Sequence, residues 1–140
     1  MKEGPIILID DDADDKDVFQ DILKDFSIPN PVLWFRNCEE AFFYLKTTTE
    51  QPFIIFCDVN IPGLTGIEFK SKIDEDKALR KKSIPFVFCS TAVSQKIVND
   101  AYTHMTVQGF FQKKNSYEEQ KQMIKSILDY WEECRHPNTK

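Results

Sequence analysis

Hydrophobic residues fall into five short runs along the chain, and longer mixed segments separate them. The runs are IILI (6–9), VLWF (32–35), FIIFC (53–57), IPFVFC (84–89) and GFF (109–111). A continuous apolar run such as FIIFC is typical of a strand that is buried on both faces. Between the runs, apolar residues recur every three or four positions, as they do on one face of a helix. The pattern predicts five strands, each followed by a helix.

The expected helices have recognisable faces and starts. The first carries Val18, Phe19, Ile22, Leu23 and Phe26 on one face, and the last carries Ile124, Ile127, Leu128 and Trp131. Asn37 with Glu40, and Ser116 with Glu119, have the spacing of residues that cap a helix start. The segment SIPNP (27–31) ends the first helix, and further helices are expected at 38–45, at 67–73 and from about residue 94.

Strands that alternate with helices favour an α/β fold in which helices cover both faces of a parallel sheet. Right-handed crossovers and five strands predict a flavodoxin-like, doubly wound (βα)5 domain with strand order 2-1-3-4-5. With 140 residues and twelve phenylalanines, the chain can form one good core. We expect a single domain over residues 1–140, with a core at about 5–131 and a frayed tail at 135–140.

Charge and composition exclude several classes of protein. The net charge is −5 and no basic run is longer than RKK at 80–82, which argues against a nucleic-acid surface. The sequence contains neither a membrane span nor a signal peptide, so we expect a cytoplasmic protein. The four cysteines, at 38, 57, 89 and 134, match no zinc pattern and are expected to be free thiols, buried for the most part.

Polar residues follow four of the five expected strands at the point where each strand ends. They are Asp10 and Asp11, Asp58, Ser90 and Thr91, and Lys113 and Lys114. The carboxyl ends of parallel strands meet at one edge of the sheet, so these groups should converge there. Clustered carboxylates suit a hard cation such as Mg²⁺, and a lysine can bind a phosphoryl oxygen. Which hydroxyl and which lysine enter the site stays open at this point.

In this order, the residues resemble the receiver domain of bacterial two-component response regulators, specifically a stand-alone one. The acidic pair after the first strand, the DVNIPGLTG loop (58–66), the hydroxyl and the lysine all correspond to the family pattern. The resemblance extends from Pro5 to about Trp131. Family spacing favours Ser90 over Thr91 and Lys113 over Lys114.

The resemblance implies a role for each residue at the strand ends. Asp58 would accept a phosphoryl group from a phosphohistidine of a sensor histidine kinase or phosphotransfer protein. Mg²⁺ would be bound directly by Asp11 and Asp58, through water by Asp10, and by the backbone carbonyl of Asn60. Lys113 would pair with Asp58 and later contact the phosphoryl group, to which Ser90 would donate a hydrogen bond.

The resemblance also implies how such a protein signals. Ser90 would move toward the phosphoryl group, and Phe110, the aromatic switch residue, would rotate into the vacated space. A protein partner would then bind the face formed by the fourth helix, the fifth strand and the fifth helix of the family fold. We expect no output domain and no enzymatic activity beyond the domain's own phosphotransfer and autodephosphorylation.

Three positions depart from the family pattern. Lys114 stands where the family usually has a proline after the site lysine, often with a cis peptide, which costs ~2.5–4 kcal/mol without proline. Ile61 replaces a methionine in the loop after Asp58, and Thr106 stands where a glycine commonly ends the helix before the fifth strand. None of these changes removes a group that would bind the phosphoryl group.

Other interpretations of the acidic residues are weaker. Asp10, Asp12 and Asp14 alternate as in a calcium-binding EF-hand loop, but that motif needs glycine at its sixth position, which is Asp15 here. A phosphatase with an aspartate nucleophile would need a second acid two residues after that nucleophile, and the residue there is Asn60. A pseudo-receiver that only binds partners would lack part of the phosphorylation residues. We assign Asp12, Asp14 and Asp15 to surface charge and helix capping, His104 to a solvated helix position and His136 to the tail.

Overall fold

Five strands form one parallel sheet in a computed structural model that describes residues 2–91 and 93–137. The strands are β1 (Ile6–Ile9), β2 (Val32–Phe35), β3 (Ile54–Cys57), β4 (Phe86–Ser90) and β5 (Phe110–Gln112). Their order is β2-β1-β3-β4-β5, with every neighbouring pair parallel. The α/β class and the flavodoxin-like order expected from the sequence are confirmed, although β3, β4 and β5 begin one or two residues later than expected.

The described residues contain six helices rather than five. They are α1 (Ala13–Asp25), α2 (Cys38–Thr47), α3 (Gly66–Glu75), α4 (Lys77–Lys82), α5 (Gln95–His104) and α6 (Tyr117–Glu133). The additional helix is α4, which has one buried apolar residue, Leu79, and so shows no hydrophobic periodicity. It is defined by its caps: the Asp76 side chain accepts a hydrogen bond from the Leu79 N–H, and Ser83 ends it at φ 53°.

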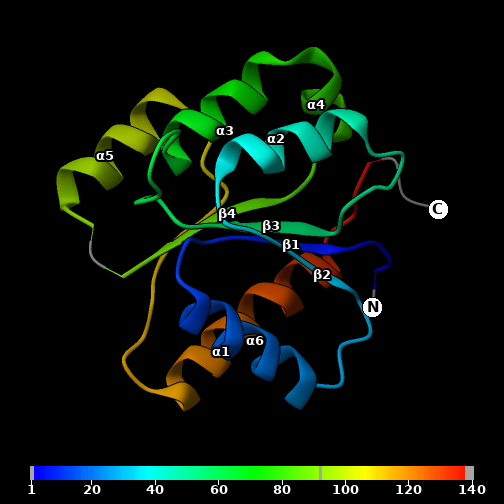
Figure 1. Cartoon of the computed structure of the whole chain (residues 1–140), viewed down its shortest axis with the longest axis vertical. Helices are drawn as coiled ribbons and strands as arrows, with labels where there is room; N and C mark the ends of the chain where they lie inside the picture. The colour runs from blue at the N-terminus through cyan, green and yellow to red at the C-terminus, as the bar shows by residue number, and fades with distance from the viewer. Residues whose placement is uncertain (1, 92, 138–140) are drawn as a thin grey trace.

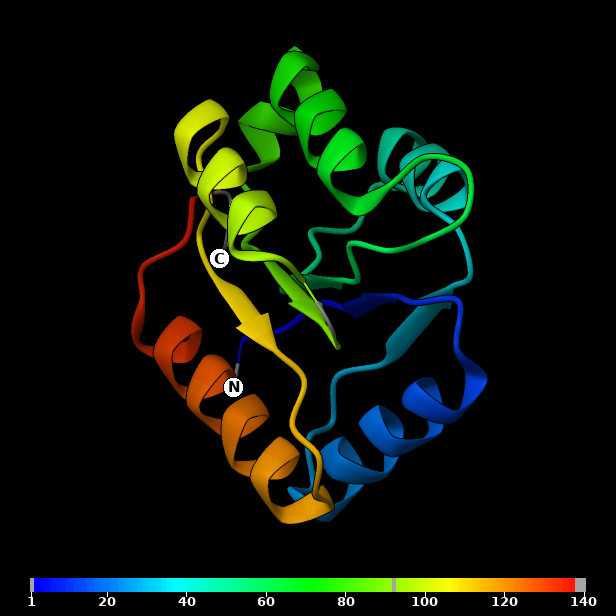
Figure 2. The ribbon, with the colours of Figure 1, turned by 90° about the vertical axis from the view of Figure 1, so that its left-hand side faces the viewer.

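Helices cover both faces of the sheet (Figure 1), with α1 and α6 on one face and α2, α3, α4 and α5 on the other. In the view turned by 90° (Figure 2), β5 and β2 lie at opposite edges of the sheet. The two faces have separate hydrophobic cores, because successive strand residues point to opposite faces. In β1, Ile7 and Ile9 belong to the core under α2 to α5, whereas Ile6 and Leu8 belong to the core under α1 and α6.

Polar residues define the starts of the helices largely as expected. The side chain of Asn37 accepts from the Glu40 N–H and starts α2. The Ser116 hydroxyl accepts from the Glu119 N–H and starts α6, but the Glu119 carboxylate accepts from that hydroxyl instead of from the Ser116 backbone. The predicted cap at Ser116 is therefore confirmed, without the full reciprocal box.

The two ends of the described chain contact each other. Lys2 Nζ donates to the backbone carbonyls of Glu132 and Cys134, at 2.6 and 2.5 Å. The His136 ring packs against Phe53 and Trp131, with centroid distances of 5.9 and 5.8 Å. Within the expected tail, His136 is therefore packed against the domain. Residues 138–140, like residues 1 and 92, lie outside the described residues.

The cysteines and the helices agree with two further expectations from the sequence. All four cysteines are free thiols, and those at 38, 57 and 89 are buried. No helix within residues 2–91 and 93–137 has the length and apolar composition that a membrane span requires. The expected cytoplasmic location stays a prediction.

Candidate functional site

The alternation of side chains along the strands explains how the candidate residues meet. Asp10, Asp58 and Lys113 each come two residues after a side chain of the α1/α6 core, so they continue toward that face. Ser90 comes two residues after Phe88, which belongs to the opposite core. The carboxylate of Asp58 can therefore be approached by the lysine from one face and by the hydroxyl from the other.

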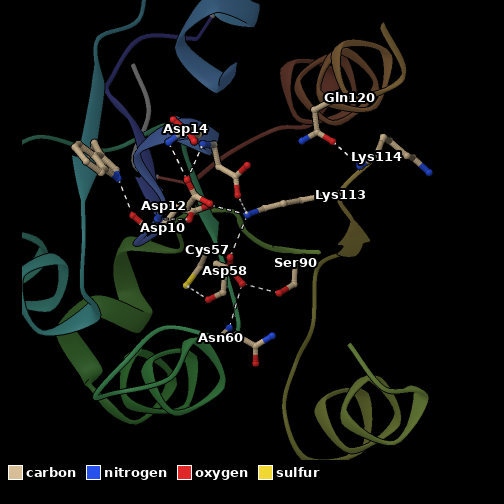
Figure 3. Close-up of polar contacts among 12 residues, drawn as sticks. Asp10, Asp12, Asp14, Cys57, Asp58, Asn60, Ser90, Lys113, Lys114 and Gln120 are labelled. Carbon is tan, nitrogen blue, oxygen red and sulfur yellow. Dashed lines mark hydrogen bonds and ion pairs between the residues drawn. The ribbon is translucent and has the colours of Figure 1, made fainter. Parts of the chain in front are cut away.

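Asp58 lies at the centre of this edge of the sheet (Figure 3). Its Oδ1 accepts from the Ser90 hydroxyl at 2.5 Å and from the Asn60 backbone N–H at 3.1 Å. Its Oδ2 accepts from Lys113 Nζ at 3.1 Å. Both carboxylate oxygens are therefore held by donors, and the side chain, which is 11% exposed, can still be reached from solvent.

Lys113 links three carboxylates that come from three different elements. Its Nζ lies 2.7 Å from Asp10 Oδ2, 2.8 Å from Asp15 Oδ2 and 3.1 Å from Asp58 Oδ2. An ammonium group has three N–H donors, and each of them has one acceptor here. Burial alone would lower the pKa of Lys113, but the hydrogen bonds to Asp10 and Asp15 outweigh burial and raise it above its ordinary value. The ammonium therefore stays charged throughout the physiological range.

Asp10 is the most deeply buried acid of the site, with 2% of its surface exposed. Its Oδ1 accepts from the Asp12 N–H at 2.9 Å, and its backbone carbonyl accepts from the Trp34 indole nitrogen at 2.7 Å. Burial raises the pKa of Asp10, and the hydrogen bond from Lys113 opposes that rise. A second cation near Asp10 would favour its ionised form further.

Three carboxylates could hold a metal ion here. Asp10, Asp11 and Asp58 each offer an oxygen, and these atoms lie within 4.8 Å of one another. Only oxygen ligands converge at this point, which suits a hard divalent cation such as Mg²⁺ or Mn²⁺. The residues therefore fit the metal that the sequence predicts. The Asn60 backbone N–H contacts Asp58, while the role of its carbonyl as a ligand stays a prediction.

The structure distinguishes the alternatives that the sequence leaves open. Lys113, not Lys114, reaches the carboxylates, whereas the Lys114 backbone N–H donates to Gln120 Oε1 at 2.7 Å. Ser90, not Thr91, contacts Asp58, and the Thr91 carbonyl accepts from a side chain of β5. The described residues contain no cis peptide bond, so the peptide between Lys113 and Lys114 is trans.

Phe110 lies on β5 and is half-buried. Its ring packs against Phe88 of β4 with a centroid distance of 5.1 Å, and it belongs to the core under α2 to α5. Ser90, at the end of β4, is fully buried and already bonded to Asp58. The Ser90 hydroxyl is therefore in contact with Asp58 in this structure, and the expected movement of Ser90 and Phe110 stays a prediction.

Sequence reasoning missed Asp15, which we assigned to surface charge and helix capping. It lies in the first turn of α1, and its carboxylate contacts Lys113 at 2.8 Å. Asp12, in contrast, is the N-cap residue of α1, as expected, and accepts from the N–H groups of Asp14 and Asp15. The position of Asp15 depends on how α1 lies against the sheet edge, for which the sequence gives no signal.

A cavity of about 260 Å³ adjoins the site between α1 and α6. Asp15, Asp58 and Lys113 contribute to its polar side, and Phe19 and Ile124 to its apolar floor. Cys89 also lines this cavity, and burial raises the pKa of its thiol to about 12. The thiol is therefore neutral at physiological pH and takes no part in the charge balance of the site.

The loop after Asp58 returns very close to it. A side-chain carbon on Gly66 would lie 2.2 Å from the Asp58 backbone carbonyl oxygen, which is closer than any real contact of this kind. Thr65 and Glu68 form a reciprocal capping box that starts α3 at this point. The loop therefore needs a glycine at position 66 to position Asp58.

Comparisons with known proteins agree with this geometry. Residues 6–125 match the family described as the response regulator receiver domain. Response regulator Rcp1 of Synechocystis sp. is 25% identical over 131 residues, which cover 90% of this chain and 87% of the relative. The crystal structure of the phosphorylated cyanobacterial phytochrome response regulator RcpA is 26% identical, with a TM-score of 0.83 over 98% of this chain and 99% of RcpA. The Mn²⁺-bound form of Rcp1 shares the fold, with 24% identity and a TM-score of 0.79 over 98% of this chain and 99% of Rcp1.

Proposed function

Because the chain belongs to the response regulator receiver domain family, we propose that Asp58 accepts a phosphoryl group in a Mg²⁺-dependent reaction. The donor is a phosphohistidine of a histidine kinase or of a phosphotransfer protein. The observation that carries this proposal is the set of contacts at Asp58. One carboxylate meets an ammonium, a hydroxyl and a cluster of two further carboxylates at the edge of the sheet.

The transfer needs little covalent chemistry from the protein beyond the nucleophile. An oxygen of Asp58 forms a bond to phosphorus, while the bond from phosphorus to the imidazole nitrogen breaks and its electron pair stays on nitrogen. Negative charge on the phosphoryl oxygens must be neutralised as this happens. Lys113 supplies one positive charge, and Ser90 supplies a hydrogen-bond donor on the other side of Asp58.

A divalent cation would supply most of the remaining charge neutralisation, and Asp10, Asp11 and Asp58 would hold it. We propose Mg²⁺ on the grounds of the oxygen-only ligands and the phosphoryl chemistry. The structure of Rcp1, which shares this fold, is a Mn²⁺-bound form, and this supports the proposal of a divalent ion.

We propose that the phosphorylated protein signals through a protein contact. The family face formed by the fourth helix, fifth strand and fifth helix corresponds here to α5, β5 and α6, because α4 is an additional short helix. This face presents Tyr102, which is 53% exposed, and the half-buried Phe110. The chain itself would catalyse only its own phosphotransfer and autodephosphorylation.

The test is phosphorylation by acetyl phosphate or by a phosphorylated kinase, with Mg²⁺ present. The wild-type chain should take up one phosphoryl group that hydroxylamine removes, because an acyl phosphate is labile to this nucleophile. Peptide mapping should place the label on Asp58. Asp58→Asn should fold and take up none, and the matched variant Asp14→Asn should be labelled like wild type. Label on Asp10, Asp12 or a histidine would contradict the assignment, and repeated hydrolysis of phosphomonoesters would indicate a phosphatase instead.

A further inference from the structure

Asp15 places a fourth carboxylate at the site, beside the three that could hold a metal. Its Oδ2 contacts Lys113 Nζ at 2.8 Å, as closely as Asp10 does at 2.7 Å. The Asp15 side chain is 39% exposed, whereas those of Asp10 and Asp58 are 3% and 11% exposed. Lys113 is thus held between two buried carboxylates on the sheet and one more accessible carboxylate on α1.

Lys113 and a divalent cation would share two of the same carboxylates. Asp10 and Asp58 both contact the ammonium, and both belong to the cluster whose oxygens lie within 4.8 Å of one another. Two cations in such a small, partly buried region repel each other strongly. Without a further anion, each cation would bind at the expense of the other. Asp15 contacts the ammonium but is not part of the metal cluster, so it can offset the charge of Lys113 alone.

We propose that Asp15 is a positioning residue that acts as the counter-ion of Lys113 and lets the ammonium and the divalent cation share Asp10 and Asp58. The inference rests on the proposed function, because it assumes that a metal binds at this cluster. When the metal takes up oxygens of Asp10 and Asp58, Asp15 still accepts one N–H of Lys113. The ammonium then stays beside Asp58 with a donor directed at the phosphorylation position.

Loss of the negative charge at Asp15 should lower the affinity of the site for the metal. The ammonium would then rely on Asp10 and Asp58 alone, so it would compete more strongly with the metal for these two carboxylates. The site would also lose one negative charge that attracts the cation. Both effects weaken metal binding, and a partly exposed ion pair corresponds to a change of about two- to fivefold in affinity.

The experiment is a Mg²⁺ titration of wild type, Asp15→Asn and Asp14→Asn, followed by backbone amide shifts at fixed ionic strength. Asp14 is the matched control: it lies in the same first turn of α1, is exposed, and forms no ion pair with any residue in the described ranges. Both variants remove one negative charge near the helix start, so their general electrostatic effects are similar. Asp15→Asn should weaken Mg²⁺ binding about two- to fivefold, and Asp14→Asn should change it by less than half as much.

A second comparison tests whether the weaker Mg²⁺ binding of Asp15→Asn depends on Lys113. In a Lys113→Met background there is no ammonium to hold, so Asp15→Asn should have no greater effect than Asp14→Asn. The NH₃⁺ resonance of Lys113 gives a readout without metal, since it should broaden in Asp15→Asn because the ammonium loses one of its three acceptors.

Equal Mg²⁺ affinities of Asp15→Asn and Asp14→Asn would overturn the inference, as would an undiminished effect of Asp15→Asn in the Lys113→Met background. These outcomes leave the proposed function intact, provided that wild type binds Mg²⁺ and is phosphorylated on Asp58. Absence of Mg²⁺ binding in wild type would instead overturn the proposed function. Thermal unfolding of each variant shows whether it is folded during the titration.

Discussion

The indole nitrogen of Trp34 donates a hydrogen bond to the backbone carbonyl of Asp10 at 2.7 Å. Trp34 belongs to the edge strand β2, and the Asp10 N–H donates to the neighbouring Phe35 carbonyl at 3.1 Å. Both backbone groups of Asp10 are therefore fixed by β2. Two cations also lie near the Trp34 ring, with Lys16 Nζ 4.8 Å and the Arg36 guanidinium carbon 4.7 Å from its centroid. A tryptophan in an edge strand thus orients the peptide that precedes Asp11.

This relationship predicts that Trp34→Phe weakens both the fold and the metal site. The phenyl ring keeps part of the packing but lacks the N–H, so the free energy of unfolding should fall by about 1–2 kcal/mol. The Asp10–Asp11 peptide would lose one of its anchors, and Mg²⁺ affinity should fall about two- to fivefold. Urea unfolding measures the first effect, and amide shifts during a Mg²⁺ titration measure the second.

The matched control is Trp131→Phe, since Trp131 lies on α6 and packs against His136, away from the acidic cluster. The intrinsic fluorescence of Trp131→Phe should still respond to Mg²⁺, because Trp34 remains. The fluorescence of Trp34→Phe should not respond. A response carried by Trp131 would contradict the proposed coupling between Trp34 and the metal site.

The sequence predicts most of the site because the site lies at strand ends. Apolar runs locate the strands, and parallel strands bring their carboxyl ends to one edge, so Asp10, Asp58 and Lys113 had to converge. The sequence does not predict that Trp34 donates a hydrogen bond to the Asp10 carbonyl, or that Asp15 forms an ion pair with Lys113. These contacts depend on the packing of an edge strand and of α1 against the sheet, which hydrophobic periodicity does not describe.

The additional helix α4 was missed for a similar physical reason. Periodicity detects a helix by its buried face, and α4 buries only Leu79. Its start depends on the side chain of Asp76, which also accepts from Lys46 Nζ at 2.6 Å, and that contact comes from α2. Local capping and one tertiary contact therefore define an element that has too few apolar residues to be recognised.

Gly66→Ala should disturb Asp58 through the backbone. The added carbon would lie 2.2 Å from the Asp58 carbonyl oxygen, so the loop or the start of α3 has to shift. We expect a loss of about 1–3 kcal/mol in the free energy of unfolding and slower phosphorylation of the variant than of wild type. Ser71→Ala, in the middle of α3, is the control and should be phosphorylated at the wild-type rate. Unchanged stability and phosphorylation of Gly66→Ala would contradict the close approach.

A pair of exposed residues joins the end of α1 to the start of α6, and it predicts a pH effect. Tyr117 Oη donates to Asp25 Oδ2 at 2.6 Å, and this hydrogen bond raises the pKa of Tyr117 to about 12 and lowers the pKa of Asp25. For Tyr117 the folded pKa exceeds the unfolded value near 10. Its contribution to stability is therefore fully present below pH ~10 and is lost as the pH rises through about 12.

Asp25→Asn should move the Tyr117 pKa back toward 10, because a neutral amide no longer disfavours the phenolate. Ultraviolet absorbance during an alkaline titration measures the change, and Tyr117→Phe identifies which tyrosine is responsible. Wild type should also lose stability relative to Asp25→Asn as the pH approaches 12. A tyrosine titration that is the same in wild type and Asp25→Asn would show that this hydrogen bond does not persist in solution.

The last prediction concerns the Ser90 hydroxyl, which donates to Asp58 before any phosphoryl group is present. Ser90→Ala removes a buried donor to a carboxylate, so the free energy of unfolding should fall by about 1–2 kcal/mol. Asp58 keeps its contacts with Lys113 and with the Asn60 N–H, so the variant should still be phosphorylated on Asp58.

Ser90→Ala should, however, lose the transfer of the phosphorylation signal from the end of β4 to Phe110. Amide shifts of residues 93–117, with and without beryllofluoride and Mg²⁺, measure this response, and it should be smaller in Ser90→Ala than in wild type. Thr91→Ala removes the neighbouring exposed hydroxyl and should respond like wild type. If Ser90→Ala and wild type respond identically while Thr91→Ala does not, the hydroxyl that couples Asp58 to β5 is that of Thr91.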